Sequence, residues 1–239
     1  MEFMIGQVIK GENLKDVILC KILLDNLKMY EFQYKLGENI DFHNISSKDK
    51  FGLYFCKLED IHLYLNFGTK IAFLKIPKEE LVYVEDKKFK VHKLIVEKIY
   101  DLKYIITWKY LLKKGFDLNK EEIFNYISYN GYLHLLKFFN ENNLVNISMY
   151  FNNILEFSIL SGNLDILDYI YKNGCKLNIK DNFAIKNACK LGFFPIVKYL
   201  HKHHINIFVN NNEPLLNAFF NNHNEIVEYL LKNGATFPI

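Results

Sequence analysis

Histidines are the residues of this sequence best suited to metal chemistry, and three of the eight gather at His201, His203 and His204. Two or three imidazoles at this spacing could coordinate a metal ion such as zinc, which binds nitrogen and sulfur ligands in proteins. No carboxylate or thiol lies at ligand spacing beside them. We therefore interpret the segment as a solvated loop, and the sequence predicts no metal site and no cofactor.

A second group with chemical potential lies in the first hundred residues, at Tyr54, Glu59, His62, His92 and Lys93. In a shared cleft these side chains could act as acids, bases or nucleotide ligands. Their spacing does not force convergence, because each also fits an ordinary position on a predicted strand or helix. The later part of the chain lacks a Ser/His/Asp or Cys/His arrangement, a phosphate-binding glycine loop and the HExxH motif. The sequence therefore predicts no catalytic residue; an enzymatic or nucleotide-handling N-terminal domain is the alternative.

The charge pattern gives no indication of a nucleic-acid partner. All 30 basic residues are lysine, against 27 acidic residues, and the net charge is +3. Arginine is the favoured bidentate ligand of guanine and phosphate, and the lysines form no basic stripe. No apolar run reaches the roughly 18 residues that a membrane helix needs. We therefore expect neither nucleic acid nor a membrane as a partner.

The four cysteines, Cys20, Cys56, Cys175 and Cys189, show no paired spacing and no CxxC motif. A disulfide framework is typical of oxidising compartments and of regularly spaced cysteines. This pattern instead indicates reduced, packed thiols, so we expect an intracellular protein.

The elements that position these side chains follow from an internal repeat in the second half of the chain. Four residues, which we name the lead residues, recur with a period of about 30: Gly131, Gly162, Gly192 and Asn222. A similar apolar pattern follows each one. A repeat of this length indicates units that stack in a row, each covering the apolar face of its neighbour. A truncated copy at residues 107–115 precedes them.

Each copy has the pattern of two helices joined by a tight turn. One of the two residues three and four positions before each lead residue is small, which lets neighbouring helices approach closely. The turn itself requires a positive φ, which glycine adopts freely and asparagine tolerates. Left-handed residues are also expected where the second helices end, at Asn143, Gly174, His204 and Gly234.

The copies resemble ankyrin repeats, whose first helix begins near Thr-Pro-Leu-His and whose usual length is about 33 residues. Only Pro214-Leu215 keeps the proline of that start, and the shorter period predicts short loops between repeats. In front of them, residues 32–39, 52–55 and 90–95 are similar, in the same order, to the N-terminal domain that precedes ankyrin repeats in giant viruses of the mimivirus group. The resemblance implies a non-enzymatic interaction protein with a host or viral protein as its partner. It also implies the host cytoplasm as its location, with the virion as the alternative.

The predicted fold class is α+β. Residues 1–102 are expected to form a small mixed α/β domain, and residues 103–239 a helical solenoid with a partial copy at 103–117 and then about four repeats. Strands are predicted at residues 52–56, 70–76, 81–84 and 89–96, and a helix at residues 58–65 with a stop at Phe67-Gly68. Residues 16–24 fit a buried strand or a short helix, and periodicity does not decide between them.

The residues that follow each turn are the predicted partner-binding residues: Tyr132, Asn163, Phe193, Phe194 and His223. They should lie along one edge of the stack, bordering the surface that repeat arrays use for partners. Phe193 and Phe194 are the strongest hot-spot candidates, although packing within the stack would account for them equally well.

Trp108 is predicted to pack where the N-terminal domain meets the repeats, as a buried anchor. We expect a monomer. Homo-oligomerisation through the last repeat is the alternative, because Ile226, Tyr229 and Leu230 have only residues 235–239 behind them.

Overall fold

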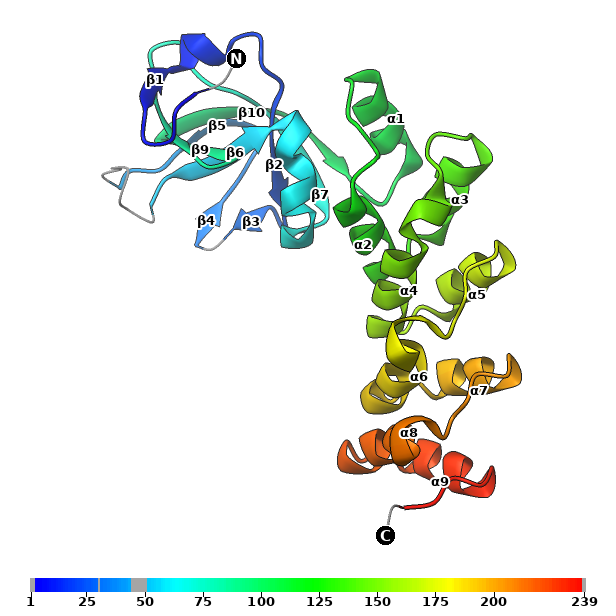
Figure 1. Cartoon of the computed structure of the whole chain (residues 1–239). Helices are drawn as coiled ribbons and strands as arrows, with labels where there is room; N and C mark the ends of the chain where they lie inside the picture. Colours follow the sequence, from blue (N-terminus) through cyan, green and yellow to red (C-terminus); the bar gives the residue numbers. More distant parts are fainter. Residues whose placement is uncertain (1–2, 30, 44–50, 238–239) are drawn as a thin grey trace. The chain divides into compact units, whose positions relative to one another are not determined.

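The computed structural model describes residues 3–29, 31–43 and 51–237. The chain divides into two compact units, residues 1–122 and 123–239. An antiparallel sheet dominates the first unit and paired helices form the second, which confirms the α+β fold class (Figure 1). Strand β10 (Lys93–Asp101) ends and helix α1 (Ile105–Lys113) begins close to the boundary predicted at residue 102. Since the compact units divide only after Glu122, the predicted domain limits stay a prediction.

Eight strands form one antiparallel sheet in the order β1-β8-β9-β6-β2-β7-β10-β5. With β10, they are β1 (Val8–Lys10), β2 (Leu19–Leu23), β5 (Gly37–Ile40), β6 (Leu53–Lys57), β7 (Lys70–Lys75), β8 (Leu81–Glu85) and β9 (Lys88–Val91). A separate hairpin pairs β3 (Lys28–Met29) with β4 (Phe32–Gln33). Two 3-10 helices, η1 (Gly11–Leu14) and η2 (Leu58–Phe67), lie between strands.

The strands predicted at residues 52–56, 70–76 and 81–84 are confirmed as β6, β7 and β8, and the undecided run at residues 16–24 contains β2. Strand β2 is buried on both faces. Leu19 and Leu23 join the main apolar cluster on one face, while Cys20 and Ile22 lie on the other. A strand covered on both faces needs no polar alternation, which explains why its sequence could not be told from a helix.

The single strand predicted at residues 89–96 is wrong, because β9 ends at Val91 and β10 starts at Lys93. The backbone N–H groups of His92 and Lys93 donate to Oε1 of Glu80, at 3.1 and 3.2 Å. The imperfect alternation of apolar residues in this segment reflects that break.

The helix predicted at residues 58–65 forms as the 3-10 helix η2, which buries Leu58, Ile61 and Leu65. Its stop at Gly68 is also confirmed, but for a different reason from a left-handed cap. Gly68 is extended, with φ 173°. A Cβ at this position would lie 2.1 Å from the Leu23 carbonyl oxygen, so the strand and the helix end can approach only across a glycine.

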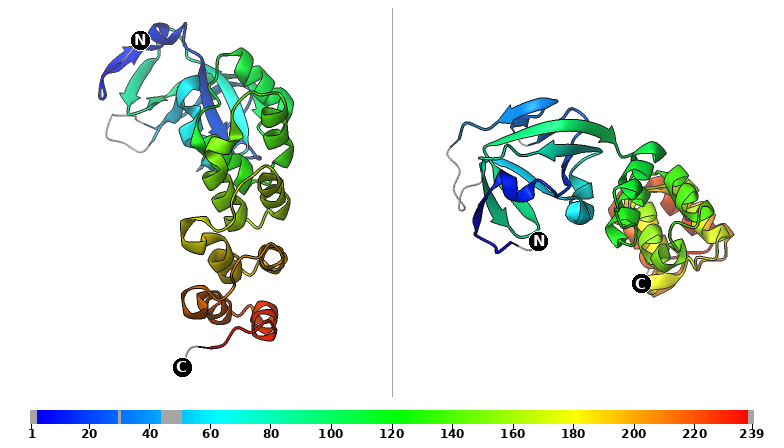
Figure 2. Two further views of the ribbon diagram at one scale, coloured as in Figure 1. Left: turned by 45° about the vertical axis from the view of Figure 1, so that its right-hand side comes forward. Right: turned by 90° about the horizontal axis from the view of Figure 1, so that it is seen from above.

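In the second unit the helices form two columns, which Figures 1 and 2 show one pair above the next. The first helices of the pairs are α2 (Glu121–Tyr129), α4 (Phe151–Leu160), α6 (Ile179–Leu191) and α8 (Val209–Phe220). The second helices are α3 (Leu133–Glu141), α5 (Leu164–Lys172), α7 (Phe194–Lys202) and α9 (Asn224–Lys232). Helix α6 contacts α4 on one side and α8 on the other. Each pair therefore covers its neighbours, as the stacked-repeat interpretation requires.

The backbone at both turns of every repeat is left-handed, as predicted. Gly131, Gly162 and Gly192 have φ of 71°, 76° and 79°, and Asn222 has 61°. At the far ends of the second helices Asn143, Gly174, His204 and Gly234 have φ of 50°, 99°, 60° and 100°. The apolar residues seven positions before each lead residue are completely buried: Phe124, Leu155, Ile185 and Leu215.

Two further left-handed segments were not predicted. Residues 180–182 and 210–212 each hold three consecutive residues with φ between 49° and 63°, inside the bounds of α6 and α8. Asparagine and aspartate, which tolerate this conformation best, occupy five of the six positions. The regular parts of α6 and α8 therefore begin at Phe183 and Glu213. The connections are correspondingly short, and no strand occurs in the described residues after Asp101.

We predict different costs for alanine at the two glycines of one repeat. At Gly174 nothing lies within 4 Å of an added Cβ, so Gly174→Ala introduces only the strain of a left-handed alanine. It should lower the free energy of unfolding by about 1 kcal/mol. Gly162→Ala places a Cβ 2.8 Å from the Phe193 ring, and should cost about 3 kcal/mol because overpacking adds to strain. Urea unfolding measures both. Equal losses for the two variants would show that the Phe193 ring does not restrict position 162. In a Phe193→Ala background, Gly162→Ala should lower the free energy of unfolding by less.

Candidate partner-binding site

The residues after the turns make contacts between repeats. Asn163 Nδ2 donates to the carbonyl oxygens of Ser128 and Tyr129 in the preceding repeat, at 2.9 and 3.2 Å. Its side chain also lies over Gly131, where a Cβ would be only 2.6 Å from Asn163 Oδ1. Asn163 therefore ties α5 to the end of α2.

Phe193 and His223 repeat this geometry one and two repeats further along. The Phe193 ring lies over Gly162, and the His223 ring lies over Gly192 and hydrogen-bonds through Nε2 to the Lys190 carbonyl at 2.9 Å. All three side chains are half-buried. Glycine is thus required at these positions for two reasons: the backbone has a positive φ, and the covering side chain leaves no room for a Cβ.

Tyr132 and Phe194 contact side chains instead. The Tyr132 ring lies 5.9 Å from those of Tyr126 and His134. Phe194 stands 5.3 Å from the Tyr229 ring, with the Lys198 ammonium 4.3 Å from its own centroid. The five predicted residues do lie at successive turns, but every one has a packing role, and their part in partner binding stays a prediction.

The exposed apolar side chains at this edge lie just before the turns, a position that sequence reasoning missed. Tyr129, Leu191 and Phe220 end the first helices α2, α6 and α8, and are 57%, 38% and 73% exposed. Leu160 ends α4 and is half-buried. The sequence does contain a signal for these residues, because an apolar or aromatic residue stands one or two positions before every turn. Helix ends that face solvent are more often polar. We name Tyr129, Leu160, Leu191 and Phe220 the apolar row.

The second helices are joined by a ladder of hydroxyl contacts. Asn140 donates to the Tyr169 hydroxyl at 3.1 Å, the Tyr199 hydroxyl donates to Asp168 at 3.1 Å, and His201 Nδ1 lies 2.8 Å from the Tyr229 hydroxyl. The hydrogen bond from Lys172 is the largest cause of the lowered pKa of Asp168. Burial, and then Asp168, raise the pKa of Tyr199.

This ladder shows what the histidine cluster does. His201 contacts Tyr229, whereas the His203 ring lies between those of Tyr171 and Tyr199, at 4.5 and 4.4 Å. The two imidazoles therefore serve different contacts. Within the described ranges no three His, Cys, Asp or Glu side chains gather in an arrangement that could hold a metal ion.

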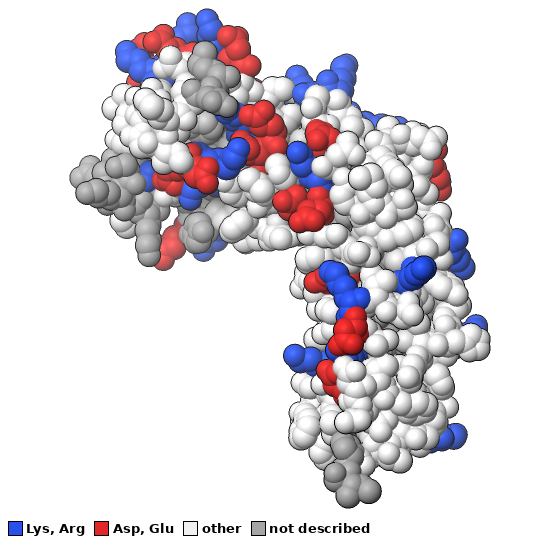
Figure 3. Space-filling model, in the orientation of Figure 1, with Lys and Arg blue, Asp and Glu red and all other residues white. Residues whose placement is uncertain are grey.

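Charged side chains cluster around the left-handed segments. Lys180 pairs with Glu156 of the preceding repeat, and Lys186 pairs with Asp181 at 2.7 Å and with Glu213 of the following repeat at 3.4 Å. Figure 3 shows acidic and basic side chains side by side on the repeat unit, within a surface that is mostly uncharged. Because these charges neutralise one another, the visible face offers no strong field of one sign to a partner.

The candidate catalytic residues of the sheet each have another partner. His62 Nδ1 lies 2.9 Å from the Glu59 carbonyl oxygen, His92 Nδ1 lies 3.3 Å from that of Asp41, and Lys93 pairs with Glu38. The Tyr54 ring is approached by the ammonium groups of Lys88 and Lys90, at 4.7 and 5.4 Å. The partners of His92 and Lys93, Asp41 and Glu38, lie outside this group.

The first unit contains a cavity of about 530 Å³. It is lined by residues 16–18, 57–59, 114–117 and 120. Its rim holds the ion pairs Lys57–Glu59, at 3.2 Å, and Lys120–Asp117, at 3.6 Å. Of the five residues considered for an enzymatic N-terminal domain, Glu59 lines this cavity, and that alternative stays untested.

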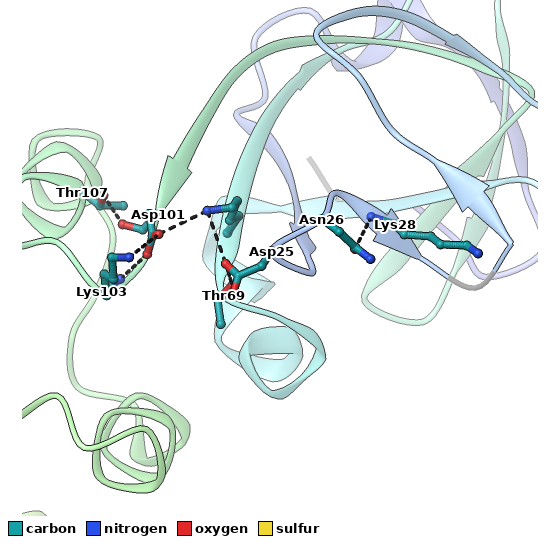
Figure 4. Close-up of polar contacts among 8 residues, drawn as sticks. Asp25, Asn26, Lys28, Thr69, Asp101, Lys103 and Thr107 are labelled. Carbon is teal, nitrogen blue, oxygen red and sulfur yellow. Dashed lines mark hydrogen bonds and ion pairs between the residues drawn. The ribbon is translucent and has the colours of Figure 1, made fainter.

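Trp108 is completely buried, and its Nε1 donates to the Leu102 carbonyl at 2.7 Å. The Thr107 hydroxyl donates to the Asp101 carbonyl at 2.6 Å, and Asp101 also accepts from the Lys103 N–H (Figure 4). Lys70 pairs with the Asp101 carboxylate at 3.2 Å. These contacts fix the end of β10 to the start of α1. The role of Trp108 as an interface between the predicted domains stays a prediction.

The apolar residues that the sequence suggested for homo-oligomerisation are not exposed at the end of the last repeat, and the oligomeric state stays a prediction. Ile226 and Leu230 are buried, and Tyr229 contacts His201. The exposed apolar residues of the described part of this repeat are Phe219, Phe220, Leu231 and Phe237, and the Phe237 ring packs 5.1 Å from Phe219. Residues 238–239, part of the predicted cap, lie outside the described residues.

Comparisons with known proteins agree with this architecture. The family model for ankyrin repeats (three copies) matches residues 182–238. A protein of Acanthamoeba polyphaga mimivirus named as an ankyrin repeat protein is 27% identical over 176 residues, which cover 68% of this chain and 86% of the relative. A second mimivirus protein, named as uncharacterized, is 34% identical over 116 residues, or 44% of this chain and 84% of its own length. The chain contains ankyrin repeats and is similar to ankyrin repeat proteins of a giant virus.

Another mimivirus ankyrin repeat protein is 25% identical over 238 residues, which cover 86% of this chain and 62% of the relative. Ankyrin repeats indicate a protein–protein interaction module. No helix among the described residues combines the length and apolar character needed to cross a bilayer.

The sheet of this ankyrin repeat protein buries a lysine that sequence reasoning missed. Lys21 lies on β2 between Leu19 and Leu23 and is 8% exposed. Its Nζ donates to the Tyr54 carbonyl at 2.7 Å and lies 5.0 Å from the Tyr34 ring centroid. No ion pair with a carboxylate is recorded for it within the described part of the chain. Burial, reinforced by the Lys88 charge, lowers the pKa of Lys21 to about 8.

We predict that Lys21→Met stabilises the protein at pH 7. The change from an ordinary pKa of 10.5 to about 8 corresponds to about 3 kcal/mol of cost for the buried ammonium. The unfolded chain keeps this proton between pH 8 and 10.5 while the folded chain loses it, so wild-type stability at this site recovers as pH rises.

Urea unfolding of both proteins at pH 7 and pH 10 checks this, with the exposed Lys15→Met as control. The advantage of Lys21→Met should shrink at the higher pH, whereas Lys15→Met should be neutral at both. A destabilised Lys21→Met at pH 7 would show that the Tyr54 hydrogen bond outweighs the burial of the charge.

Proposed function

We propose that this protein is a non-enzymatic adaptor whose ankyrin repeats bind a host or viral protein at the apolar row. The observation that supports this is that three of the four first helices end in an exposed apolar side chain, Tyr129, Leu191 or Phe220. Exposed aromatic residues in a line, bordered by polar ones, are typical of protein interfaces. Tyr129 and Phe220 are of the residue types that dominate binding hot spots or enrich interface cores.

The spacing of the row suits a regular partner. Neighbouring helices pack about 8–10 Å apart, so the helix ends that carry the row follow one another at about that distance along the stack. On a helical partner, every seventh side chain lies on the same face, about 10.5 Å further along the helix axis. An amphipathic helix lying along the row could therefore place one apolar side chain against each repeat.

The sequence suggested that the residues after the turns contact the partner directly; we expect them to act on binding indirectly. Asn163, Phe193 and His223 hold neighbouring repeats in register, and thereby fix the spacing of the apolar row. Substituting them would weaken binding through the stack rather than through lost contact with the partner.

Affinity capture from giant-virus-infected host cells tests the proposal. The bait variant Tyr129→Ser/Leu191→Ser/Phe220→Ser removes three exposed members of the apolar row. The control Met149→Ser/Phe208→Ser removes side chains that are 73% and 43% exposed next to the opposite ends of the first helices. We expect the row variant to lose at least tenfold of the captured partner, because several hot-spot contacts disappear.

The control bait should retain the partner that the wild-type chain captures. Equal recovery by the wild-type chain and the row variant would contradict binding at the apolar row. Circular dichroism of both variants should match the wild type, since all five side chains are exposed.

A further inference from the structure

Two cysteines of the sheet face each other across neighbouring strands. Cys20 on β2 and Cys56 on β6 are direct partners in the antiparallel register. The Leu58 N–H donates to the Ile18 carbonyl at 2.8 Å, and counting two residues along each strand from this bond places the cysteines at a hydrogen-bonded position. The Cα atoms of such pairs lie about 5.5 Å apart, inside the range of disulfides of about 4.4–6.8 Å.

The two sulfur atoms share one small space. Residues directly opposite in a sheet project to the same face. Cys56 Sγ lies 3.6 Å from the Cys20 carbonyl oxygen, and burial together with a hydrogen bond to Cys56 raises the pKa of Cys20. A disulfide could therefore join them without moving the strands apart.

The cover over the pair is the 3-10 helix η2, which packs against both β2 and β6. It is a 3-10 helix of ten residues, Leu58–Phe67. Because 3-10 helices longer than three or four residues are uncommon and have poorer hydrogen-bond geometry, η2 should open before the sheet unfolds. Opening would expose both thiols together.

The other two cysteines have no such partner geometry. Cys175 Sγ lies 3.9 and 3.6 Å from the carbonyl oxygens of Phe151 and Lys176, and Cys189 lies within helix α6. All four cysteines are free and buried. Cys175 and Cys189 serve as internal controls in the same chain.

We propose that Cys20 and Cys56 are a reversible redox pair, which forms a disulfide by exchange with a low-molecular-weight disulfide of the glutathione class when η2 opens. This inference concerns the sheet and is independent of partner binding by the repeats.

The reaction takes place in two exchange steps. The Cys56 thiolate attacks one sulfur of the small disulfide, forming a mixed disulfide and releasing one small thiolate. The Cys20 thiolate then attacks the Cys56 sulfur, forming the Cys20–Cys56 bond and releasing the second small thiolate. The two protons lost by the cysteines are taken up by the two released thiolates. The protein is oxidised by two electrons, and the small disulfide is reduced to two thiols.

The disulfide would link β2 to β6 and make a covalent loop of the intervening chain, which carries β3, β4 and β5. Such a closure restricts the unfolded chain. The oxidised protein should therefore hold η2 and the central strands more firmly against unfolding than the reduced protein does.

The test treats the full chain with oxidised glutathione, in urea just sufficient for an alkylating reagent to reach Cys20 and Cys56. Remaining thiols are then alkylated, and the protein is digested and analysed by mass spectrometry. Before alkylation we expect the intact mass to fall by two hydrogens. After alkylation and digestion we expect a Cys20–Cys56 cross-linked peptide together with alkylated Cys175 and Cys189. Cys20→Ala should stop at the mixed disulfide and keep one glutathionyl group, while Cys175→Ala should behave as the wild type.

The wild-type readout stands even where a cysteine variant fails to fold. Full alkylation of Cys20 and Cys56 after oxidant treatment would overturn the proposal. So would cross-links to Cys175 or Cys189 formed as fast as the Cys20–Cys56 bond.

Discussion

The repeat unit depends on the close approach of one repeat to the turn of the repeat before it. At Gly131, Gly162 and Gly192 a side chain from the next repeat occupies the place where a Cβ would stand. The backbone there is also left-handed, so glycine satisfies a conformational and a steric demand at one position. Stacking of the apolar helix faces supplies the driving force, and these contacts set the distance and register at which the faces meet. The spacing of the apolar row follows from that register.

Much of the repeat unit could be predicted from the sequence, because glycine that recurs at a fixed interval indicates a repeated turn. The left-handed turns, the buried positions seven residues earlier and the helix ends at Asn143 and His204 all follow from one periodic pattern. The direction of the turn side chains could not be predicted. Asn163 and His223 have ordinary polar side chains in sequence, and only the structure shows that they reach carbonyl oxygens in the preceding repeat.

The sheet was harder to predict, because its pairings join residues far apart in the chain. Strand β2 carries an apolar run without alternation, and its neighbours β6 and β7 come tens of residues later. Lys21 interrupts that run at a buried position, where only the structure shows the Tyr54 carbonyl as its partner. The Cys20–Cys56 register likewise has no signature in cysteine spacing. The sheet thus holds a buried lysine and two facing cysteines that no pattern in the sequence indicates.

Hydrogen exchange of Phe193→Ala, compared with the wild-type chain, tests most directly whether contacts at the turns hold neighbouring repeats together. The Phe193 ring belongs to one repeat and covers Gly162 of the repeat before it. The account predicts faster exchange of the backbone amides around the Gly162 turn, with the amides of β8 unchanged. Faster exchange confined to α6 and α7, with the Gly162 turn as protected as in the wild type, would contradict it.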